Sequence, residues 1–156
     1  MSGNIKIEHS TNYSIVKEIM TNPTLMKVSL PPEDQAICND GKWEADPSYT
    51  YVLIYEGDKV VGLIRYQSMT NVMIHFHFHL LPEYWGSGVS DKAEELLFKY
   101  FRENTHYKKA ITFTPWECKE VQSALARGGY EFEGILTNAI YWNNKIQHLI
   151  IAVKEI

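Results

Sequence analysis

The chain has few cysteines and no run of basic residues, and each absence excludes a class of protein. Its two cysteines, Cys38 and Cys118, are too far apart in the sequence to match the spacing of a zinc site or a disulfide framework. Lysine and arginine are scattered and the net charge is -4, whereas phosphate binding needs clustered cations. We therefore expect a reducing compartment, the cytoplasm, and no nucleic-acid partner.

Long hydrophobic runs are also lacking. Residues 1–10 contain no apolar core of a signal peptide, and no stretch of about 18 apolar residues occurs elsewhere. We therefore expect no membrane partner. The hydrophobic fraction of 45% and the charged fraction of 22% are ordinary for a globular protein, and the length of 156 residues fits a single domain over residues 1–156.

The order of the apolar patterns predicts an α/β (α+β) domain. Periods typical of strands occur at 5–7, 51–55, 59–67, 72–81, 110–113, 130–141 and 146–154. Helical periods occur at 12–20, 33–38, 89–101 and 115–127, and Asn22-Pro23 is interpreted as the end of the first helix. These patterns predict a mixed central sheet of about six to seven strands with about four helices.

A turn of small residues between the predicted strand 72–81 and the helix that follows it carries the most information about function. An α-helix N-terminus has unpaired N–H groups and a partial positive charge, and glycines let an anion approach that backbone. The turn therefore predicts a pyrophosphate site, although Gly-x-Gly also occurs in ordinary turns. A Rossmann fingerprint is disfavoured because its third glycine is absent. The turn reads Trp85-Gly86-Ser87-Gly88-Val89-Ser90.

This turn resembles motif A of the GCN5-related N-acetyltransferases (GNAT). In that family a strand and a Pro-containing turn lead through Q/R-x-x-G-x-G/A into a helix. The matching residues are Trp85-x-x-Gly88-x-Ser90, preceded by Pro82. The resemblance implies an acyl-CoA N-acyltransferase-like fold.

A second stretch resembles the end of motif B, so the resemblance covers nearly the whole chain. Gly129-Tyr130 is followed there by Glu133-Gly134. The chain departs from the family at Trp85, where Arg or Gln is usual, and it is similar in this divergence to GNAT-like proteins of phages. It is identified as a divergent member.

The resemblance also implies an activity and a co-substrate. The activity is N-acetyl transfer from acetyl-CoA by direct attack of an amine, of a small molecule or a protein, on the thioester. The backbone N–H groups of residues 85–90 would hold the pyrophosphate, and the backbone near His79 and Leu80 would bind the pantetheine arm and the acetyl carbonyl. The family's usual acid is a Tyr at the position of Leu125, which cannot donate a proton. A nearby tyrosine, Tyr130 or Tyr141, could act as the acid instead, with Tyr130 the preferred candidate, or both could be core aromatics.

Three histidines, His75, His77 and His79, alternate along the predicted strand and so share one face. Histidine transfers protons near neutral pH, so they are the candidate catalytic bases. They could instead be three histidines with satisfied hydrogen bonds, beneath a helix or beside solvent. The family's register would turn the opposite face, which carries Phe76 and Phe78, toward the acceptor unless a bulge exchanges the two faces.

Two other functions remain open. The departures at Trp85 and Leu125 fit a GNAT-like fold that has lost catalysis and serves as a binding or assembly protein. Its partner would then be a second copy of the chain or another protein. If the source is viral, the compartment would be the host cytoplasm. A metal-binding protein that uses His75, His77 and His79 is the other alternative, although the third ligand lies too far along a flat strand and we expect no metal site. The acidic side chains between residues 24 and 49 would favour a cationic acceptor, or form a solvated loop.

Overall fold

The computed structural model describes residues 3–30 and 32–156, which form one sheet of seven strands flanked by five α-helices. The strands are β1 (Ile5–Ser10), β2 (Thr50–Glu56), β3 (Lys59–Ser68), β4 (Met73–Leu80), β5 (Lys109–Pro115), β6 (Glu131–Trp142) and β7 (Lys145–Glu155). The helices are α1 (Tyr13–Met20), α2 (Pro23–Ser29), α3 (Pro32–Asn39), α4 (Val89–Asn104) and α5 (Lys119–Arg127), with a 3-10 turn, η1 (Pro82–Tyr84), before α4.

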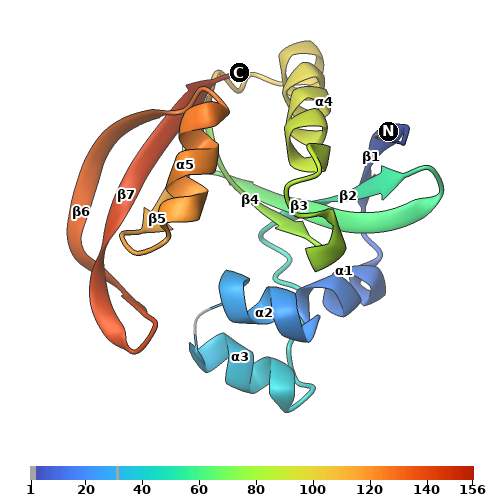
Figure 1. Cartoon of the computed structure of the whole chain (residues 1–156). Coiled ribbons are helices and arrows are strands. Elements are labelled where there is room, and N and C mark those ends of the chain that lie inside the picture. Colours follow the sequence, from blue (N-terminus) through green and yellow to red (C-terminus); the bar gives the residue numbers. More distant parts are fainter. Residues whose placement is uncertain (1–2, 31) are drawn as a thin grey trace.

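The sheet is mixed, as predicted, with the order β1-β2-β3-β4-β5-β7-β6. β1 to β4 pair antiparallel, β4 and β5 pair parallel, and β5, β7 and β6 pair antiparallel. Helices α1, α2 and α3 lie on one face, and α4 and α5 lie on the other (Figure 1). Among the described residues, no helix is both long enough and apolar enough to cross a membrane.

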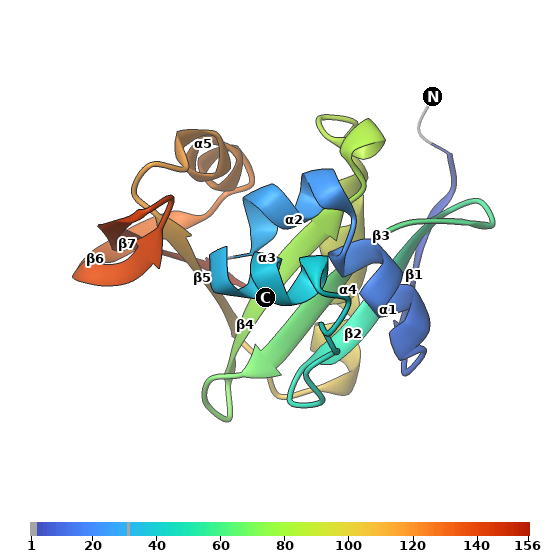
Figure 2. The same ribbon diagram turned by 90° about the horizontal axis from the view of Figure 1, so that it is seen from below.

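The parallel pairing of β4 with β5 is short and decides where the site lies. Only three pairs form, and the last joins His75 to Ile111. Beyond that point β4 continues beside β3 and β5 continues beside β7, so the two strands diverge (Figure 2). The sheet therefore opens into a V between its two antiparallel halves.

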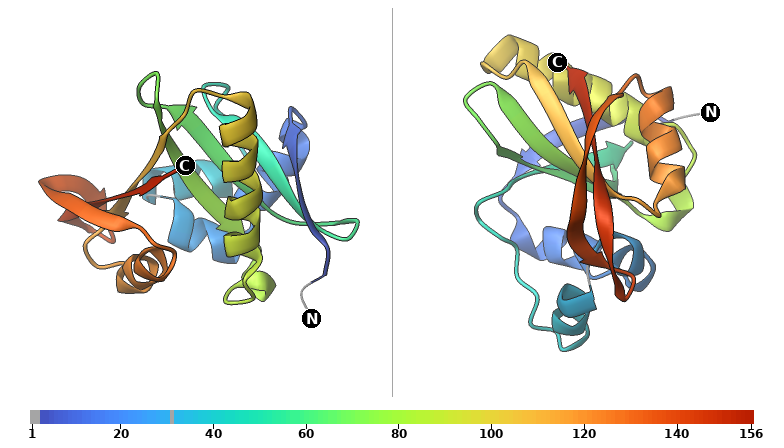
Figure 3. Two further views of the ribbon diagram at one scale, coloured as in Figure 1. Left: turned by 90° about the horizontal axis from the view of Figure 1, so that it is seen from above. Right: turned by 90° about the vertical axis from the view of Figure 1, so that its left-hand side faces the viewer.

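Two hydrophobic cores lie on the two faces of the sheet. On one face, α4 packs its buried stripe, which includes Ala93, Leu97 and Phe101, against Ile74 and Phe76 of β4. Figure 3 shows α4 lying along this face. On the other face, α1 and α2 cover the apolar side chains of β2 and β3. The alternation along β4 therefore places its Ile and Phe side chains under α4 and its histidines on the face of α1 and α2.

The outermost strand, β6, is irregular and largely exposed. Its pairing with β7 shifts register twice, between Phe132 and Gly134 and between Leu136 and Ile140. Within the second shift, Asn138 has a φ of 49°, a left-handed conformation that asparagine tolerates better than most residues.

Asn22-Pro23 ends the first helix, as predicted, but a helix that was not predicted, α2, follows it directly. The Asn22 side chain accepts hydrogen bonds from the backbone N–H groups of Thr24 and Leu25, both at 3.1 Å. Pro23 occupies the first turn of α2, where its missing N–H has no consequence. The same two residues that stop α1 therefore start α2.

We expect Asn22→Ala to lower the free energy of unfolding by about 1 kcal/mol, because two N–H groups at the start of α2 lose their acceptor. Urea unfolding measures the change. Asn22→Asp replaces the amide oxygen by a carboxylate oxygen at the same position, so the two N–H groups keep an acceptor, and this variant is the matched control. If the Asp variant lost as much stability as the Ala variant, the capping role would be contradicted.

Candidate functional site

A cavity of about 440 Å³ lies where β4 and β5 diverge. Its walls come from both faces of the sheet. Val28 of α2 and Arg65 of β3 lie on one side, while Glu94 of α4 and Leu125 of α5 lie on the other. The cavity therefore crosses the sheet through the V, so that a molecule on one face can reach a molecule on the other.

The edge of β4 presents backbone groups that have no partner on β5 to this cavity. The N–H of Leu81 donates to the carbonyl of Val61 at 3.0 Å, and in an antiparallel pair every second residue back along β4 then bonds to β3. The intervening residues, Phe78 and Leu80, therefore direct their N–H and C=O groups toward the opposite edge. That edge faces the divergence, because the pairing with β5 ends at His75.

The glycine turn forms a second set of donors just beyond the C-terminal end of β4. Gly86 has a φ of 71° and Gly88 a φ of 83°, and no described atom lies within 4 Å of a Cβ built on either. Within the described chain, the backbone N–H groups of Gly86, Gly88 and Ser90 donate to no protein acceptor. Together with the N-terminus of α4, these groups can bind an anion.

Ser87 and Val89 support the shape of this turn. The Ser87 hydroxyl donates to the carbonyl of Tyr84 at 2.6 Å and accepts from the N–H of Val89 at 3.4 Å. The N–H of Val89 is therefore already used, so an anion would meet the N–H groups on either side of it.

Trp85 stands where the GNAT motif usually has Arg or Gln, and its indole holds the turn against β4. The indole N–H donates to the carbonyl of Leu80 at 2.8 Å, while the side chain is 48% exposed. Trp85 therefore stabilises the backbone of the turn.

The three histidines lie on the face of α1 and α2, and β3 and β4 keep one continuous register, so a bulge does not exchange the faces. His77 and His79 line the cavity. His79 is 2% exposed, and within the described residues neither of its ring nitrogens has a hydrogen-bond partner; the same is true of Nε2 of His75. Both nitrogens of His79 and one nitrogen of His75 are therefore buried without a protein partner in the described chain.

Burial and a neighbouring cation keep these histidines neutral. Burial first, and then the Arg65 guanidinium, lower the pKa of His75 to about 4. The same two causes and His75 lower the pKa of His77 to about 3. Burial, Arg65 and His77 hold the pKa of His79 well below its ordinary value. Near neutral pH each ring therefore has one N–H and one free lone pair.

The histidines are not arranged as a metal site. Among the described residues, no group of three or more His, Cys, Asp or Glu side chains could hold an ion. The ring centroids of His75 and His77 are 4.3 Å apart, and those of His77 and His79 are 6.1 Å apart. The metal-binding alternative therefore has no support in the structure.

Tyr130 lies in the cavity wall, but its hydroxyl is occupied. It donates to Glu94 Oε2 at 3.0 Å, and Lys154 Nζ lies 2.6 Å from the other oxygen of that carboxylate. Burial and the charge of Glu94 raise the pKa of Tyr130. The phenol therefore holds its proton firmly, which disfavours it as a donor to a leaving group. Cys118 lies in the same wall, and burial followed by Glu117 raises the pKa of its thiol.

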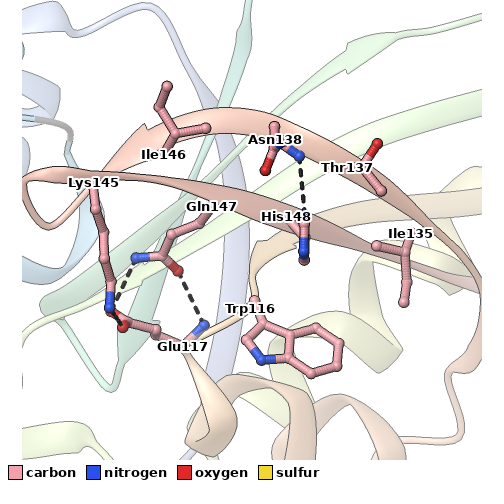
Figure 4. A pocket seen from close by; sticks show the side chains of 9 residues that line it. All are labelled: Trp116, Glu117, Ile135, Thr137, Asn138, Lys145, Ile146, Gln147 and His148. Atoms are coloured by element: carbon pink, nitrogen blue, oxygen red, sulfur yellow. Dashed lines mark hydrogen bonds and ion pairs between the residues drawn. The ribbon is translucent and has the colours of Figure 1, made fainter.

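A second hollow, of about 610 Å³, lies between the β6–β7 hairpin and Trp116 (Figure 4). Its polar groups bond to one another. The Gln147 side chain donates to Glu117 Oε2 at 2.9 Å and accepts from the N–H of Glu117 at 3.2 Å. The N–H of Asn138 donates to His148 Nδ1 at 3.0 Å. These internal bonds leave few groups for a ligand, so the cavity in the V is the better candidate site.

Two residues of the site were not predicted. Phe78 directs free backbone groups into the V, and Arg65 lies directly opposite His77 in the β3–β4 register. The hairpin between β3 and β4 could have indicated the pairing of Arg65 with His77, because both strands were predicted and their register follows from the turn. The free backbone groups of Phe78 could not have been predicted, because they depend on the point at which β4 leaves β5, for which the sequence carries no signal.

Comparisons with known proteins place the chain among acetyltransferase folds. Residues 33–145 match a protein family described as a protein of unknown function (DUF2824), and no curated protein matches significantly. The solved structure of RimL, a ribosomal L7/L12 alpha-N-protein acetyltransferase in complex with coenzyme A, matches with a TM-score of 0.76 and 10% identity over 97% of this chain and 94% of that one. Spermidine N-acetyltransferase from Vibrio cholerae, in complex with CoA and spermine, matches with a TM-score of 0.76 and 14% identity over 97% and 95%. The predicted GNAT fold is confirmed.

The low pKa of His77 predicts sensitivity to acid. In the unfolded chain this histidine takes up a proton near its ordinary pKa of 6.5. In the folded chain its pKa is about 3, so it stays unprotonated until the pH falls to that value. Between these values the unfolded state binds more protons, so the free energy of unfolding falls as pH falls, by up to about 1.4 kcal/mol per pH unit for each such histidine.

Urea unfolding between roughly pH 6 and pH 4 tests this linkage. His77→Gln removes the titrating group and should give a shallower fall than the wild type. His106→Gln removes an exposed histidine that lines a separate surface hollow and controls for the loss of any histidine. Identical slopes for the wild type and His77→Gln would contradict the buried, neutral state of His77.

Proposed function

This chain belongs to the DUF2824 family, and from its GNAT fold and the geometry of its cavity we propose that it is an acetyl-CoA-dependent N-acetyltransferase acting on an amine. One observation carries the proposal. The cavity crosses the sheet at the divergence of β4 and β5, and a turn of unpaired N–H groups lies beyond the end of β4. A thioester on one face and an amine on the other could meet there.

The residues present fit acetyl-CoA. When bound, acetyl-CoA would supply an acetyl thioester, which an amine can attack. The N–H groups of Gly86, Gly88 and Ser90 would hold the pyrophosphate against the N-terminus of α4. The edge N–H and C=O of Phe78 and the N–H of Leu80 would bind the pantetheine arm, since the carbonyl of Leu80 already accepts from the Trp85 indole. An N–H at this edge would stabilise negative charge that develops on the acetyl oxygen.

His77 and His79 would bind the acceptor amine. Both line the cavity on the face opposite α4, and both are neutral, so a ring lone pair can accept an N–H of the amine. Since the pKa of His77 is about 3, its ring holds a proton only weakly. We propose that these histidines select and orient the unprotonated amine. As its nitrogen bonds to the acetyl carbon the C–S bond would break, so that CoA would leave as a thiolate that takes a proton from solvent, while the amine would lose its proton to solvent. We assign no proton donation to Tyr130, because its hydroxyl is bound to Glu94.

Gly88→Ala tests the turn. The added Cβ projects into the open space that the anion would occupy, and the φ of 83° strains any side chain there, so we expect acetyl-CoA binding to weaken at least about tenfold. Gly57→Ala is the matched control, since Gly57 has a φ of 62°, equally open surroundings and a place in the β2–β3 turn. Both variants should lose about 1 kcal/mol of stability.

Calorimetric titration of acetyl-CoA into the three proteins measures this difference. The wild type and Gly57→Ala should bind alike. If the wild type binds no acetyl-CoA, the proposed function is wrong. If Gly88→Ala binds as tightly as Gly57→Ala, the turn does not hold the pyrophosphate.

His77→Asn tests the acceptor side. We expect the release of CoA from acetyl-CoA, assayed with a panel of small amines, to slow at least about tenfold, because the amine loses a positioning group. The affinity for acetyl-CoA should stay within about threefold of the wild type, since the coenzyme contacts the other wall. His75→Asn changes the neighbouring histidine on the same face and should have a smaller effect. An equal loss in both variants would argue against a specific role for His77.

A further inference from the structure

The cavity wall on the side of α2 carries an uncompensated cation. Arg65 is the one Lys or Arg among the described residues that line the cavity, and within the described chain it makes no ion pair. Its Nε is buried and has no acceptor there. The ring of Tyr49 lies 4.8 Å from the guanidinium carbon and covers one face, but a ring gives the N–H edge no oxygen. A guanidinium keeps its charge, so an anion that enters the cavity would meet a cation whose N–H edge has no protein partner in the described chain.

The cavity-lining neighbours of Arg65 supply no anion to it. Asp46 is the acid nearest in effect: hydrogen bonds to Ser48 and, to a smaller extent, the charge of Arg65 lower its pKa, but the two form no ion pair in the described chain. His77 lies directly opposite Arg65 in the β3–β4 register, and His79 follows two residues later; both are neutral near pH 7. Glu94, on the far wall, is already bound by Lys154 and Tyr130. The wall therefore offers one positive charge beside two neutral imidazoles, of which His79 has both nitrogens buried and unpartnered in the described chain.

Resting on the proposed acetyltransferase function, we propose that the acceptor is a short amine that carries a carboxylate, with the carboxylate on Arg65 and the amine beside His77 and His79. A guanidinium pairs with a carboxylate through two parallel N–H bonds, and one cation matches one negative charge, whereas a phosphate dianion would call for more. The amine and the acid must lie close together, because Arg65 and His77 are cross-strand partners.

The acidic segment before β2 does not favour a cationic acceptor instead. Glu44 pairs with Lys17 at 3.0 Å, and the Asp46 carboxylate accepts from the N–H of Ser48 at 2.8 Å. Among the described cavity-lining residues, neither acid is present. The charge that an acceptor meets in the cavity is therefore that of Arg65.

Matched pairs of ligands test the proposal through binding rather than turnover. Glycine, β-alanine and 4-aminobutyrate are compared with their carboxamides, and with spermidine, by calorimetry and ligand-detected NMR in the presence of CoA. We expect the wild type to bind at least one acid about tenfold or more tighter than its carboxamide, since a charge-assisted bidentate pair is lost in the amide. Spermidine should bind more weakly than that acid.

Variants of Arg65 assign the effect to this side chain. Arg65→Gln should reduce the preference for the acid to less than about threefold. Arg65→Lys should keep part of the preference, because lysine keeps the positive charge but cannot donate two parallel N–H bonds from a planar group. The affinity for CoA should remain as in the wild type in both. Arg102→Gln removes an exposed cation of α4 outside the cavity and should keep the full preference.

The outcomes separate this inference from the function on which it rests. A wild type that binds CoA but binds none of the acids, or binds them no tighter than the carboxamides, overturns the carboxylate site and leaves the acetyltransferase proposal standing. A full preference in Arg65→Gln overturns the assignment to Arg65. A wild type that does not bind CoA overturns the proposed function itself. If Arg65→Gln does not fold, the ligand pairs on the wild type and Arg65→Lys still decide.

Discussion

The early end of the hydrogen bonding between β4 and β5 is the constraint on which the rest of the structure depends. Each strand has an antiparallel neighbour on its other side, β3 for β4 and β7 for β5, so each can leave the other without losing its place in the sheet. The separation exposes an edge in the middle of the sheet. Backbone N–H and C=O groups at such an edge need partners, and a ligand that runs along it can supply them.

The same separation explains why the two sides of the site differ in chemistry. On the side of α4 and α5 the wall is apolar, and its one acid is held by Lys154 and Tyr130. On the side of α2, Arg65 and the histidines keep free hydrogen-bonding groups in buried positions. Unpartnered polar groups in a native interior are costly, so they are expected where a ligand completes them. The polar wall is therefore the more specific half of the cavity, and the apolar wall is the supporting half.

Much of this fold could be predicted from the sequence because the long elements have clear periods. The stripe of α4 and the alternation of β4 both follow from residue spacing, and the turn before α4 is visible as two glycines. Helix α2 escaped because it has seven residues and its start signal, Asn22-Pro23, equally ends the helix before it. A helix this short depends on its cap and on packing more than on periodicity.

The site itself was only partly predictable, since its contacts join distant segments. His77 and His79 stood out as chemical groups, but their neutral state comes from burial and from Arg65, which lies across a hairpin. Tyr130 was a reasonable acid by residue type. Its bond to Glu94, 36 positions earlier in the chain, depends on how α4 packs beside Tyr130 and beside Lys154 of β7. Such pairings follow from tertiary packing and not from local pattern.

The break at Asn138 has a consequence for how this chain behaves in a crowded solution. β6 is an edge strand of 12 residues, and it exposes Ile135, Leu136 and Tyr141. A flat edge of that length would present a continuous row of backbone groups to the same edge of another molecule. The left-handed Asn138 and the register shift around it interrupt that row, so a second chain could pair with only part of it. The bulge thus allows an apolar edge strand to face water while limiting strand-by-strand aggregation.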